Sequence, residues 1–338
     1  LDIVLGDNGR VTRPADPGAT PGTTWLRTDG TTLRSVLLQD VVTSTSSVPA
    51  GTGTGDTIAG GTGRDLLFGQ AGGDDLAGGP DDDYLEGNVG DDMLSGDAGE
   101  DDLVGGGSSS NGAIITVSGA TVGDRLLTAP ETATDRTASG LVDGNDALDG
   151  GGQRDVLLGD NGRITREGPG APLIGGASGP QAVRQVAMAD EGPGVWAGSD
   201  VLAGGEGDDD LYGQFDNTRT TRPQQTYLDQ RVPGDVLDGG AGDDALLGDQ
   251  GSNVPTPAAA LGAVDRTLSD STRFLRELVR PTGTLVAVAT LSQTTLGGDD
   301  LVLGGTGADS VHAGAGKDVV NAGADDDTVF AGDGGDAL

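Results

Sequence analysis

Hydrophobic residues recur along this chain every nine positions, which matches neither the two-residue period of a strand nor the 3.6-residue period of a helix. From residue 51 the sequence divides in constant phase into GTGTGDTIA, GGTGRDLLF, GQAGGDDLA, GGPDDDYLE, GNVGDDMLS and GDAGEDDLV. Each unit opens with glycine and holds aspartate at position six and an aliphatic residue at position eight. Positions seven to nine predict a short strand with its middle side chain inward, and the glycines before them predict a turn.

The nine-residue pattern restarts after each of several interruptions. Positions six and eight are again occupied in the pairs Asp146/Leu148, Asp155/Leu157, Asp200/Leu202, Asp209/Leu211, Asp235/Leu237, Asp244/Leu246, Asp300/Val302, Asp309/Val311, Asp318/Val320, Asp327/Val329 and Asp336/Leu338, and Asp2/Val4 fit at the start. A fixed period of this kind is typical of a solenoid. We therefore predict an all-β fold, a parallel β-roll (β-solenoid) with two repeats per coil, interrupted by β-rich insertions.

The interruptions divide the chain into alternating segments. We expect the end of a repeat run at 1–9, an insertion at 10–50, a six-repeat roll at 51–106, an insertion at 107–141, a short roll at 142–162, an insertion at 163–195, a short roll at 196–213, an insertion at 214–231, a short roll at 232–249, an insertion at 250–295 and a roll at 296–338 that continues beyond the chain end. Strands are expected at 31–45, 113–118 and 284–292, and a helix at 270–280 between a possible N-cap, Asp270, and Pro281. Asn8-Gly9 and Asn161-Gly162 predict hairpin turns.

Composition sharpens this picture. The 338 residues include 64 glycines and no cysteine, and the formal net charge is −35. Without cysteine, neither disulfides nor thiolate metal sites can stabilise so small a core. The acidity argues against nucleic acid, whose phosphates require basic residues, and indicates a soluble cation as the partner.

Stacking the coils brings aspartates eighteen residues apart, such as Asp56 and Asp74, close together. Their mutual repulsion is removed by a hard divalent cation, and Ca²⁺ takes six to eight oxygen ligands from carboxylates and backbone carbonyls. We therefore predict multiple Ca²⁺ sites in the turns. The predicted ligands are the position-six aspartates Asp56, Asp65, Asp74, Asp83, Asp92, Asp101, Asp146, Asp155, Asp200, Asp209, Asp235, Asp244, Asp300, Asp309, Asp318, Asp327 and Asp336.

The nonapeptides resemble the G-G-x-G-x-D-x-U-x repeat (U, aliphatic) of RTX (repeat-in-toxin) calcium-binding proteins, and the alternation with insertions resembles their large modular bacterial surface and adhesin members. The resemblance implies secretion, commonly by a type I system, and folding of the roll in millimolar calcium. Some repeats depart from the pattern. Asp81 replaces the second core glycine of its repeat, and Ala313, Ala322 and Ala331 replace the first glycine in the last run. We expect calcium to bind more weakly there.

Signatures of catalysis are missing from the sequence. Neither H-E-x-x-H nor G-x-S-x-G occurs, and the single histidine, His312, stands at position nine of a repeat, where we expect it on the surface. We therefore predict that the chain is not an enzyme. Where runs end in GDNG or GDQG, Asp7, Asp160 and Asp249 are either terminal calcium ligands or, as we favour, turn residues.

Three functions are compatible with these features. The first is a non-enzymatic extracellular module of an adhesin, surface layer or filament that folds on binding calcium and contacts copies of itself, with no nucleic acid and no membrane insertion. The second is the calcium-binding region of a secreted RTX protease or lipase whose catalytic domain lies outside this chain. The third is glycan or ice binding by the insertions, where Trp25 and Trp196 could stack on sugars, although anchoring a loop is the commoner role of such residues.

The arginines outside the repeats leave a further choice open. Most arginines lie in the insertions, whereas the repeats are acidic. They either pair with the repeats of their own chain, which contributes little to stability, or contact the acidic repeats of a neighbouring subunit.

Overall fold

The computed structural model describes residues 2–7, 9–12, 31–38, 55–107, 114–120, 144–167, 183–188, 198–214, 225–227, 230–232, 234–249, 276–279, 285–288 and 298–338. Every regular element within these residues is a strand. Accordingly, this part of the chain holds no helix with the length and apolar character needed to cross a membrane.

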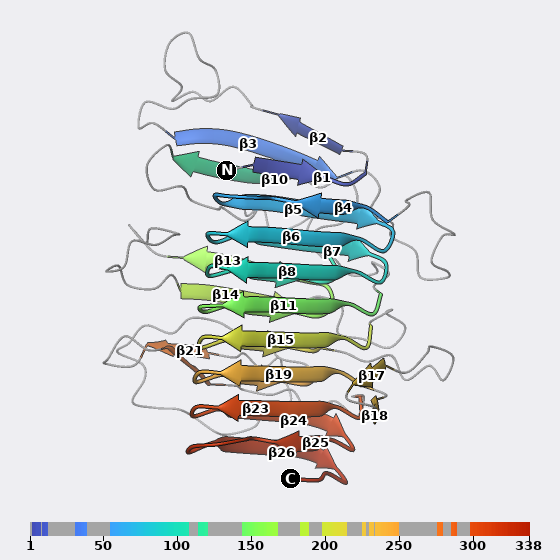
Figure 1. The fold of residues 1–338 in the computed structure, drawn as a ribbon, viewed down its shortest axis with the longest axis vertical. Coiled ribbons are helices and arrows are strands. Elements are labelled where there is room, and N and C mark those ends of the chain that lie inside the picture. Colours follow the sequence, from blue (N-terminus) through green and yellow to red (C-terminus); the bar gives the residue numbers. More distant parts are fainter. Residues whose placement is uncertain are drawn as a thin grey trace.

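The repeats form a parallel β-roll in which two sheets face each other and successive coils stack along one axis (Figure 1). The nine-stranded sheet has the order β1 (Asp2–Leu5), β5 (Asp65–Ala71), β7 (Tyr84–Val89), β9 (Asp102–Val104), β12 (Val156–Leu158), β16 (Asp210–Tyr212), β20 (Ala245–Leu247), β24 (Ser310–Gly316), β26 (Thr328–Gly334). The eight-stranded sheet runs from β4 (Thr57–Ala59) through β6 (Asp75–Pro80), β8 (Met93–Ala98), β11 (Ala147–Gly152), β15 (Val201–Glu206), β19 (Val236–Ala241) and β23 (Leu301–Thr306) to β25 (Val319–Asn321). The predicted all-β parallel roll is confirmed.

The nine-residue pattern sets the strand register, and interruptions of the chain leave it unchanged. Leu67 pairs with Leu85, eighteen residues later. Leu103 pairs with Leu157 in the same manner, although an insertion lies between them. In both cases position eight stands opposite position eight, so the inward side chains of adjacent coils come into contact.

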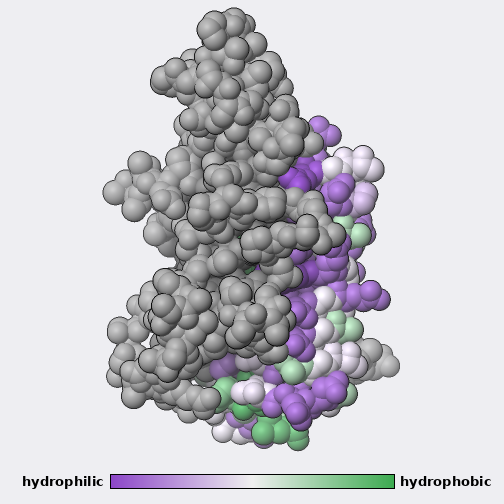
Figure 2. All heavy atoms as spheres, turned by 90° about the vertical axis from the view of Figure 1, so that its left-hand side faces the viewer, coloured by the Kyte–Doolittle hydropathy of each residue, from purple (hydrophilic) through white to green (hydrophobic). Residues whose placement is uncertain are grey.

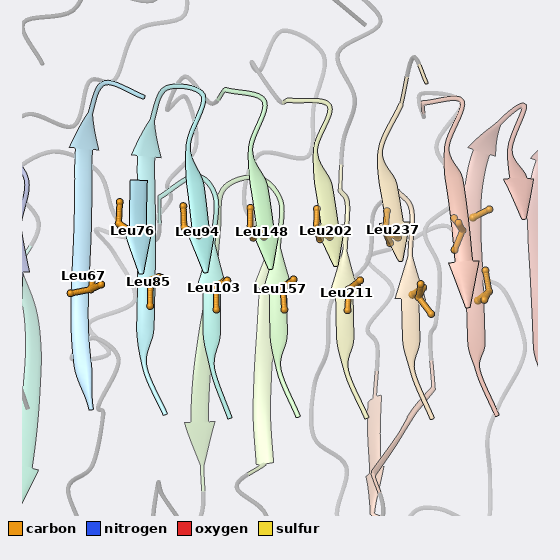
Figure 3. Packing of buried hydrophobic residues seen from close by; sticks show 14 of the residues in the cluster. Leu67, Leu76, Leu85, Leu94, Leu103, Leu148, Leu157, Leu202, Leu211 and Leu237 are labelled. Carbon is orange, nitrogen blue, oxygen red and sulfur yellow. The ribbon is translucent and has the colours of Figure 1, made fainter. Parts of the chain in front are cut away.

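The interior of the roll is a ladder of these position-eight side chains. Leu67, Leu85 and Leu103 from one sheet face Leu76 and Leu94 from the other, and the pattern continues along the axis (Figure 3). All five are at most 2% exposed. Glycine-rich repeats thus bury one large side chain per nonapeptide in a narrow core.

All insertions leave the roll at the same edge. They follow β1, β9, β12, β16 and β20 of the nine-stranded sheet and return at β4, β11, β15, β19 and β23 of the eight-stranded sheet. We call this the insertion edge, and the opposite edge, where β4 leads directly into β5 and β6 into β7, the plain edge.

The described parts of the insertions form antiparallel pairs outside the roll. They are β13 (Gly162–Glu167) with β14 (Val183–Met188), β17 (Gln225–Tyr227) with β18 (Gln230–Val232), and β21 (Arg276–Val279) with β22 (Leu285–Val288). A three-stranded sheet joins β2 (Gly9–Thr12) and β3 (Thr31–Leu38) of the first insertion to β10 (Ile114–Ala120) of the second. The three ranges predicted to be strands, 31–45, 113–118 and 284–292, therefore overlap the observed strands β3, β10 and β22.

Two local predictions are wrong. Residues Arg276–Val279, which fall within the helix expected over 270–280, form strand β21, while 270–275 and 280 lie outside the described residues. The Asn-Gly pairs also do not close hairpins. The strands on either side of each pair belong to different sheets, because β1 and β12 lie in the roll whereas β2 and β13 pair with strands of the insertions.

The outer faces of the two sheets differ in character. On the nine-stranded sheet, large outward side chains at positions seven and nine are buried, among them Phe68, Leu158 and Tyr212 at no more than 1% exposure. A buried ion pair lies on the same face, with 2.8 Å between Arg154 Nη2 and Asp210 Oδ2. On the eight-stranded sheet the equivalent residues are mostly small or exposed, such as Ala59 and Asp149. The nine-stranded sheet thus buries apolar side chains on both faces, which the single inward position per repeat did not predict.

The surface position predicted for His312 is also wrong. Its side chain is 7% exposed and lies parallel to the ring of Phe330, with 4.7 Å between the ring centroids. Burial lowers the pKa of His312 to about 4, so the imidazole is neutral at physiological pH. We find no catalytic partner for it among the described residues, and its role is to pack on the outer face of the nine-stranded sheet.

Candidate calcium sites

The predicted ligand aspartates lie at the two edges of the roll, where each turn ends and the next strand begins. The plain edge carries Asp2, Asp65, Asp83, Asp101, Asp155, Asp209, Asp244, Asp309 and Asp327, and the insertion edge carries Asp56, Asp74, Asp92, Asp146, Asp200, Asp235, Asp300, Asp318 and Asp336. Every predicted ligand therefore joins one of two rows parallel to the roll axis. Asp2, which fits the repeat but was not among the predicted ligands, begins the plain-edge row.

Each row is a continuous hydrogen-bonded ladder. The backbone N–H of Asp65 donates to Oδ1 of Asp83 at 2.7 Å, and the N–H of Asp83 donates to Oδ1 of Asp101 at the same distance. Along the plain edge these bonds link Asp2, Asp65, Asp83, Asp101, Asp155, Asp209, Asp244, Asp309 and Asp327 in turn. Along the insertion edge they link Asp56, Asp74, Asp92, Asp146, Asp200, Asp235, Asp300, Asp318 and Asp336. One carboxylate oxygen of each acceptor residue is thus used to hold adjacent coils in register.

The second carboxylate oxygen, Oδ2, faces the interior of the turn. It is buried and has no hydrogen-bond partner among the described residues in Asp56, Asp65, Asp74, Asp83, Asp92, Asp244, Asp309 and Asp318. A buried acceptor without a partner carries a large desolvation cost. A regular row of such atoms indicates that a cation or a hydrogen-bond donor belongs in these turns.

Glycine at position one of most repeats leaves the space into which Oδ2 points. A Cβ added to Gly60 would lie 2.7 Å from Asp65 Oδ2 and 2.8 Å from the carbonyl oxygen of Gly78 in the next coil. The corresponding distances for Gly150 are 2.6 Å to Asp155 Oδ2 and 2.8 Å to the carbonyl oxygen of Gly204. A carboxylate oxygen and a carbonyl oxygen therefore converge on one small volume, and neither can donate a hydrogen bond to the other.

The electrostatics of the turns favour a cation. Burial raises the pKa of Asp92 and of Asp244 to about 8 and that of Asp83 to about 7, because removal from water penalises the charged form. The backbone N–H donated to each carboxylate lowers its pKa, while neighbouring aspartates of the same row raise it further. Burial and repulsion win over the hydrogen bond, so these aspartates need a positive charge nearby to be ionised at neutral pH.

The atoms available in the turns suit calcium. They are carboxylate and backbone carbonyl oxygens, which are the ligands of a hard cation that tolerates irregular geometry. The described residues contain no cluster of three or more His, Cys, Asp or Glu side chains suited to one metal ion. Each site would therefore combine an aspartate of the row with backbone carbonyl oxygens of the glycine turn. Ligation by the individual aspartates stays a prediction.

The aspartates at the ends of the repeat runs have a structural role that the sequence only suggested. Asp160 Oδ1 accepts the N–H of Gly198 at 2.6 Å, and Asp249 accepts the N–H groups of Gly298 and Ala315 at 3.2 and 2.5 Å. Gly198 and Gly298 are the residues at which the chain returns from an insertion. These two carboxylates therefore join the point of exit to the point of re-entry, and the preference for a turn residue over a terminal calcium ligand stays a prediction.

A comparison with models of known protein families matches the repeats that form the roll. The model of the RTX calcium-binding nonapeptide repeat matches residues 50–85, 77–109, 142–163, 197–218, 234–255, 294–329 and 303–338, together about half of the chain. A sequence search found no individual curated protein that matches. The matched segments contain the coils of the roll between Gly55 and Leu338, and such repeats bind Ca²⁺ at multiple sites. The chain belongs to the family of RTX calcium-binding nonapeptide repeat proteins.

Proposed function

We propose that this chain is a structural module of a bacterial surface protein, such as an adhesin, a surface layer or a filament, whose roll folds and stiffens when it meets calcium outside the cell. The ligands are the position-six aspartates of the two rows, together with the carbonyl oxygens of the glycine turns. The observation that carries the proposal is the pair of continuous carboxylate ladders whose Oδ2 atoms face carbonyl oxygens of the next coil.

The aspartate rows couple folding to the metal. In the roll, aspartates such as Asp92 and Asp244 are buried beside others of the same row. In the unfolded chain they are hydrated and far apart, so the sites do not exist before the coils stack. Calcium therefore binds the folded state and stabilises it, by about 2.7 kcal/mol for each site filled at a hundred times its dissociation constant.

We place the module outside the cell, where calcium is concentrated enough to fill weak sites. Extracellular calcium modules commonly have dissociation constants of about 10⁻⁴ to 10⁻³ M. Sites in this range fill in millimolar calcium and stay empty at the low free calcium of the cytoplasm. The chain would then pass through secretion unfolded and become rigid only at its destination.

Far-UV circular dichroism of the whole chain tests this coupling. The chain is titrated with CaCl₂ from an EGTA-containing buffer, and a parallel titration uses MgCl₂ at equal ionic strength. We expect β-structure to appear cooperatively with Ca²⁺ and to remain largely absent with Mg²⁺, which keeps its own water ligands. A spectrum that is the same in EGTA and in calcium, or an equal response to both ions, would contradict the proposal.

The surface role is tested separately, by negative-stain electron microscopy and light scattering in calcium. A structural component of a layer or filament is expected to form ordered assemblies or long particles as its concentration rises. A chain that folds in calcium but stays monomeric at high concentration would leave the calcium coupling standing and remove the self-assembling filament and surface-layer forms of the proposal.

A further inference from the structure

Three turns near the end of the roll differ from the others at one position. Position one is alanine in the turns that lead to Asp318, Asp327 and Asp336, and the three alanines are Ala313, Ala322 and Ala331. In the other turns that join two repeats directly it is glycine, and where an insertion intervenes the glycine after the preceding strand takes its place, as Gly105 does beside Asp146 Oδ2. We call the two groups alanine turns and glycine turns.

A methyl group at position one enters the space that the calcium sites need. At Gly239, in a glycine turn, an added Cβ would lie 2.5 Å from Asp244 Oδ2 and 2.6 Å from the carbonyl oxygen of Gly304. A carbon and an oxygen that are not bonded stay at least about 3.3 Å apart. An alanine fits only if the carboxylate or the neighbouring coil moves, and its methyl then fills part of the volume on which the two oxygens converge.

The hydrogen bonds of the carboxylate ladders are longer at the alanine turns. In the glycine turns, the distance from the backbone nitrogen to Oδ1 of the next aspartate is between 2.6 and 2.9 Å along both edges. In the alanine turns the acceptors Asp318, Asp327 and Asp336 lie at 3.0, 3.1 and 3.2 Å. The three longest bonds of the ladders thus coincide with the three alanines.

The coils that carry alanine turns also make apolar contacts, while Oδ2 of Asp318 is buried without a partner among the described residues, as in the glycine turns. Ala313 is fully buried and belongs to the central hydrophobic cluster, together with Val311 and Val320. On the outer face of the same coils, His312 and Phe330 stack with an interplanar angle of 9°. These contacts do not depend on a metal ion.

We infer that the alanine turns are a second class of turn, which binds Ca²⁺ at least about tenfold more weakly than the glycine turns and holds its coils mainly by side-chain packing. This inference deepens the proposed calcium sites and rests on them. The roll then has a long section bridged by calcium and a short section, from about residue 313 onward, whose turns stay empty at calcium concentrations that fill the rest.

Direct counting of bound calcium tests the inference. Equilibrium dialysis of the whole chain against increasing free Ca²⁺ is carried out on the parent and on the triple variant Ala313→Gly, Ala322→Gly, Ala331→Gly. We expect the triple variant to bind up to three more ions per chain at the concentration where the parent first reaches a plateau. Equal stoichiometry and equal midpoints in the two proteins would overturn the inference.

A reciprocal variant guards against a folding defect in the triple variant. Gly304→Ala places a methyl beside Asp309 Oδ2, so we expect one ion fewer per chain. Gly152→Ala is the matched control. Its Cβ would lie 3.9 Å from the nearest atom, the carbonyl oxygen of Asp97, and its calcium count should equal that of the parent. A Gly304→Ala variant that retains the full count would also overturn the inference.

The same measurements separate this inference from the proposed function. A parent chain that binds no calcium removes both. A parent chain that binds many ions, with counts indifferent to alanine or glycine at position one, removes only the division into two classes of turn.

Discussion

The two edges of the roll are built from the same repeat, yet only one of them is interrupted. At the plain edge the chain passes from one sheet to the other in a single short turn, whereas at the insertion edge it repeatedly leaves the roll. The hydrogen-bond distances in the carboxylate ladder are the same whether or not an insertion intervenes. Asp74 N–H donates to Asp92 Oδ1 across 18 residues and Asp92 N–H to Asp146 Oδ1 across 54 residues, both at 2.7 Å.

Loop closure explains how the insertion edge tolerates its interruptions. The entropy lost when a chain closes a loop grows only with the logarithm of loop length, so going from 18 to 54 residues costs about 1 kcal/mol. The returning strand regains a full set of backbone bonds, an inward leucine and a carboxylate rung, which together outweigh this cost. Register in this molecule is therefore set by the repeat and is independent of the length of chain between repeats.

Calcium removal should have the largest effect and should act on both edges alike. If calcium bridges each coil to the next, the rungs of the plain edge and of the insertion edge lose protection together in EGTA. Hydrogen exchange with mass spectrometry on peptides that contain Asp83 or Asp92 measures this, and we expect exchange to accelerate by at least about a hundredfold at both. Protection that persists at one edge alone would show that the two edges are held by different means.

The response to pH should reverse its sign with calcium. Without metal, the pKa of Asp244 at the plain edge and of Asp92 at the insertion edge is raised from 3.8 to about 8. The folded state then binds more protons than the unfolded state between these values, so stability falls as pH rises from about 4 to about 8. With calcium bound, the carboxylates must be ionised, and stability rises over the same range. The amount of β-structure, followed by far-UV circular dichroism in EGTA and in calcium at several pH values, checks this, and parallel trends in the two buffers would refute it.

Replacement of one ladder aspartate by asparagine compares the edges site by site. In Asp83→Asn and Asp92→Asn the amide oxygen can still accept the backbone N–H, but an NH₂ group points at the carbonyl oxygen of the turn. We expect a loss of about 1.5–3 kcal/mol in calcium, of equal size at the two edges. Urea unfolding in calcium measures the effect. The control, Asp75→Asn, removes the same charge from an exposed side chain and should change little.

Shortening an insertion should have the smallest effect. Deletion of residues 216–232 with Pro233→Gly restores a nine-residue repeat between Gly213 and Asp235, and glycine is needed because this position has a positive φ in other turns, such as 146° at Gly242. The rung from Asp200 N–H to Asp235 Oδ1 would then span 18 residues in place of 35, a gain of about 0.6 kcal/mol in loop closure. Dialysis should return the same calcium count as the parent. A lower count would mean that this insertion contributes to the sites.

The repeat and its aspartate rows could be predicted from sequence because they depend on neighbours at a fixed separation. The frame that places Leu67 opposite Leu85 also places Asp65 beside Asp83, and both hold in the structure. The sequence did not indicate that one oxygen of each carboxylate accepts a backbone N–H of the previous coil. The residue types are the same whether the carboxylate accepts a backbone N–H or whether both carboxylates contact a metal ion directly, so the sequence does not distinguish the two arrangements.

A period of nine does not predict the outer faces, because strands of the same sheet recur with a period of eighteen. Position nine is bulky in the nine-stranded sheet, as at Phe68, Leu158 and Tyr212, and small in the eight-stranded sheet, as at Ala59 and Ala77. Separating odd from even repeats would have revealed this difference and the burial of His312. On the face seen in Figure 2, hydrophobic surface gathers at the last coil, where Phe330 and Leu338 are exposed, while the strip along the roll is mainly hydrophilic.

The helix expected at 270–280 failed for a different reason. Phe274, Leu275, Leu278 and Val279 fit one face of a helix, but four apolar positions in so short a segment also fit a strand. Strand β21 pairs with β22, and this tertiary pairing decides the conformation of Arg276–Val279.

Each rung of the ladders has a direction, since the amide belongs to one coil and the acid that receives it to the coil that follows. A coil is therefore locked by its successor. A lesion at Asp155 would loosen the coil of Asp101 that precedes it and leave its own amide bonded to Asp209. Loss of one carboxylate therefore weakens the coil before it, while sheet hydrogen bonds such as that from Val156 N–H to the Asp101 carbonyl oxygen still join the two coils.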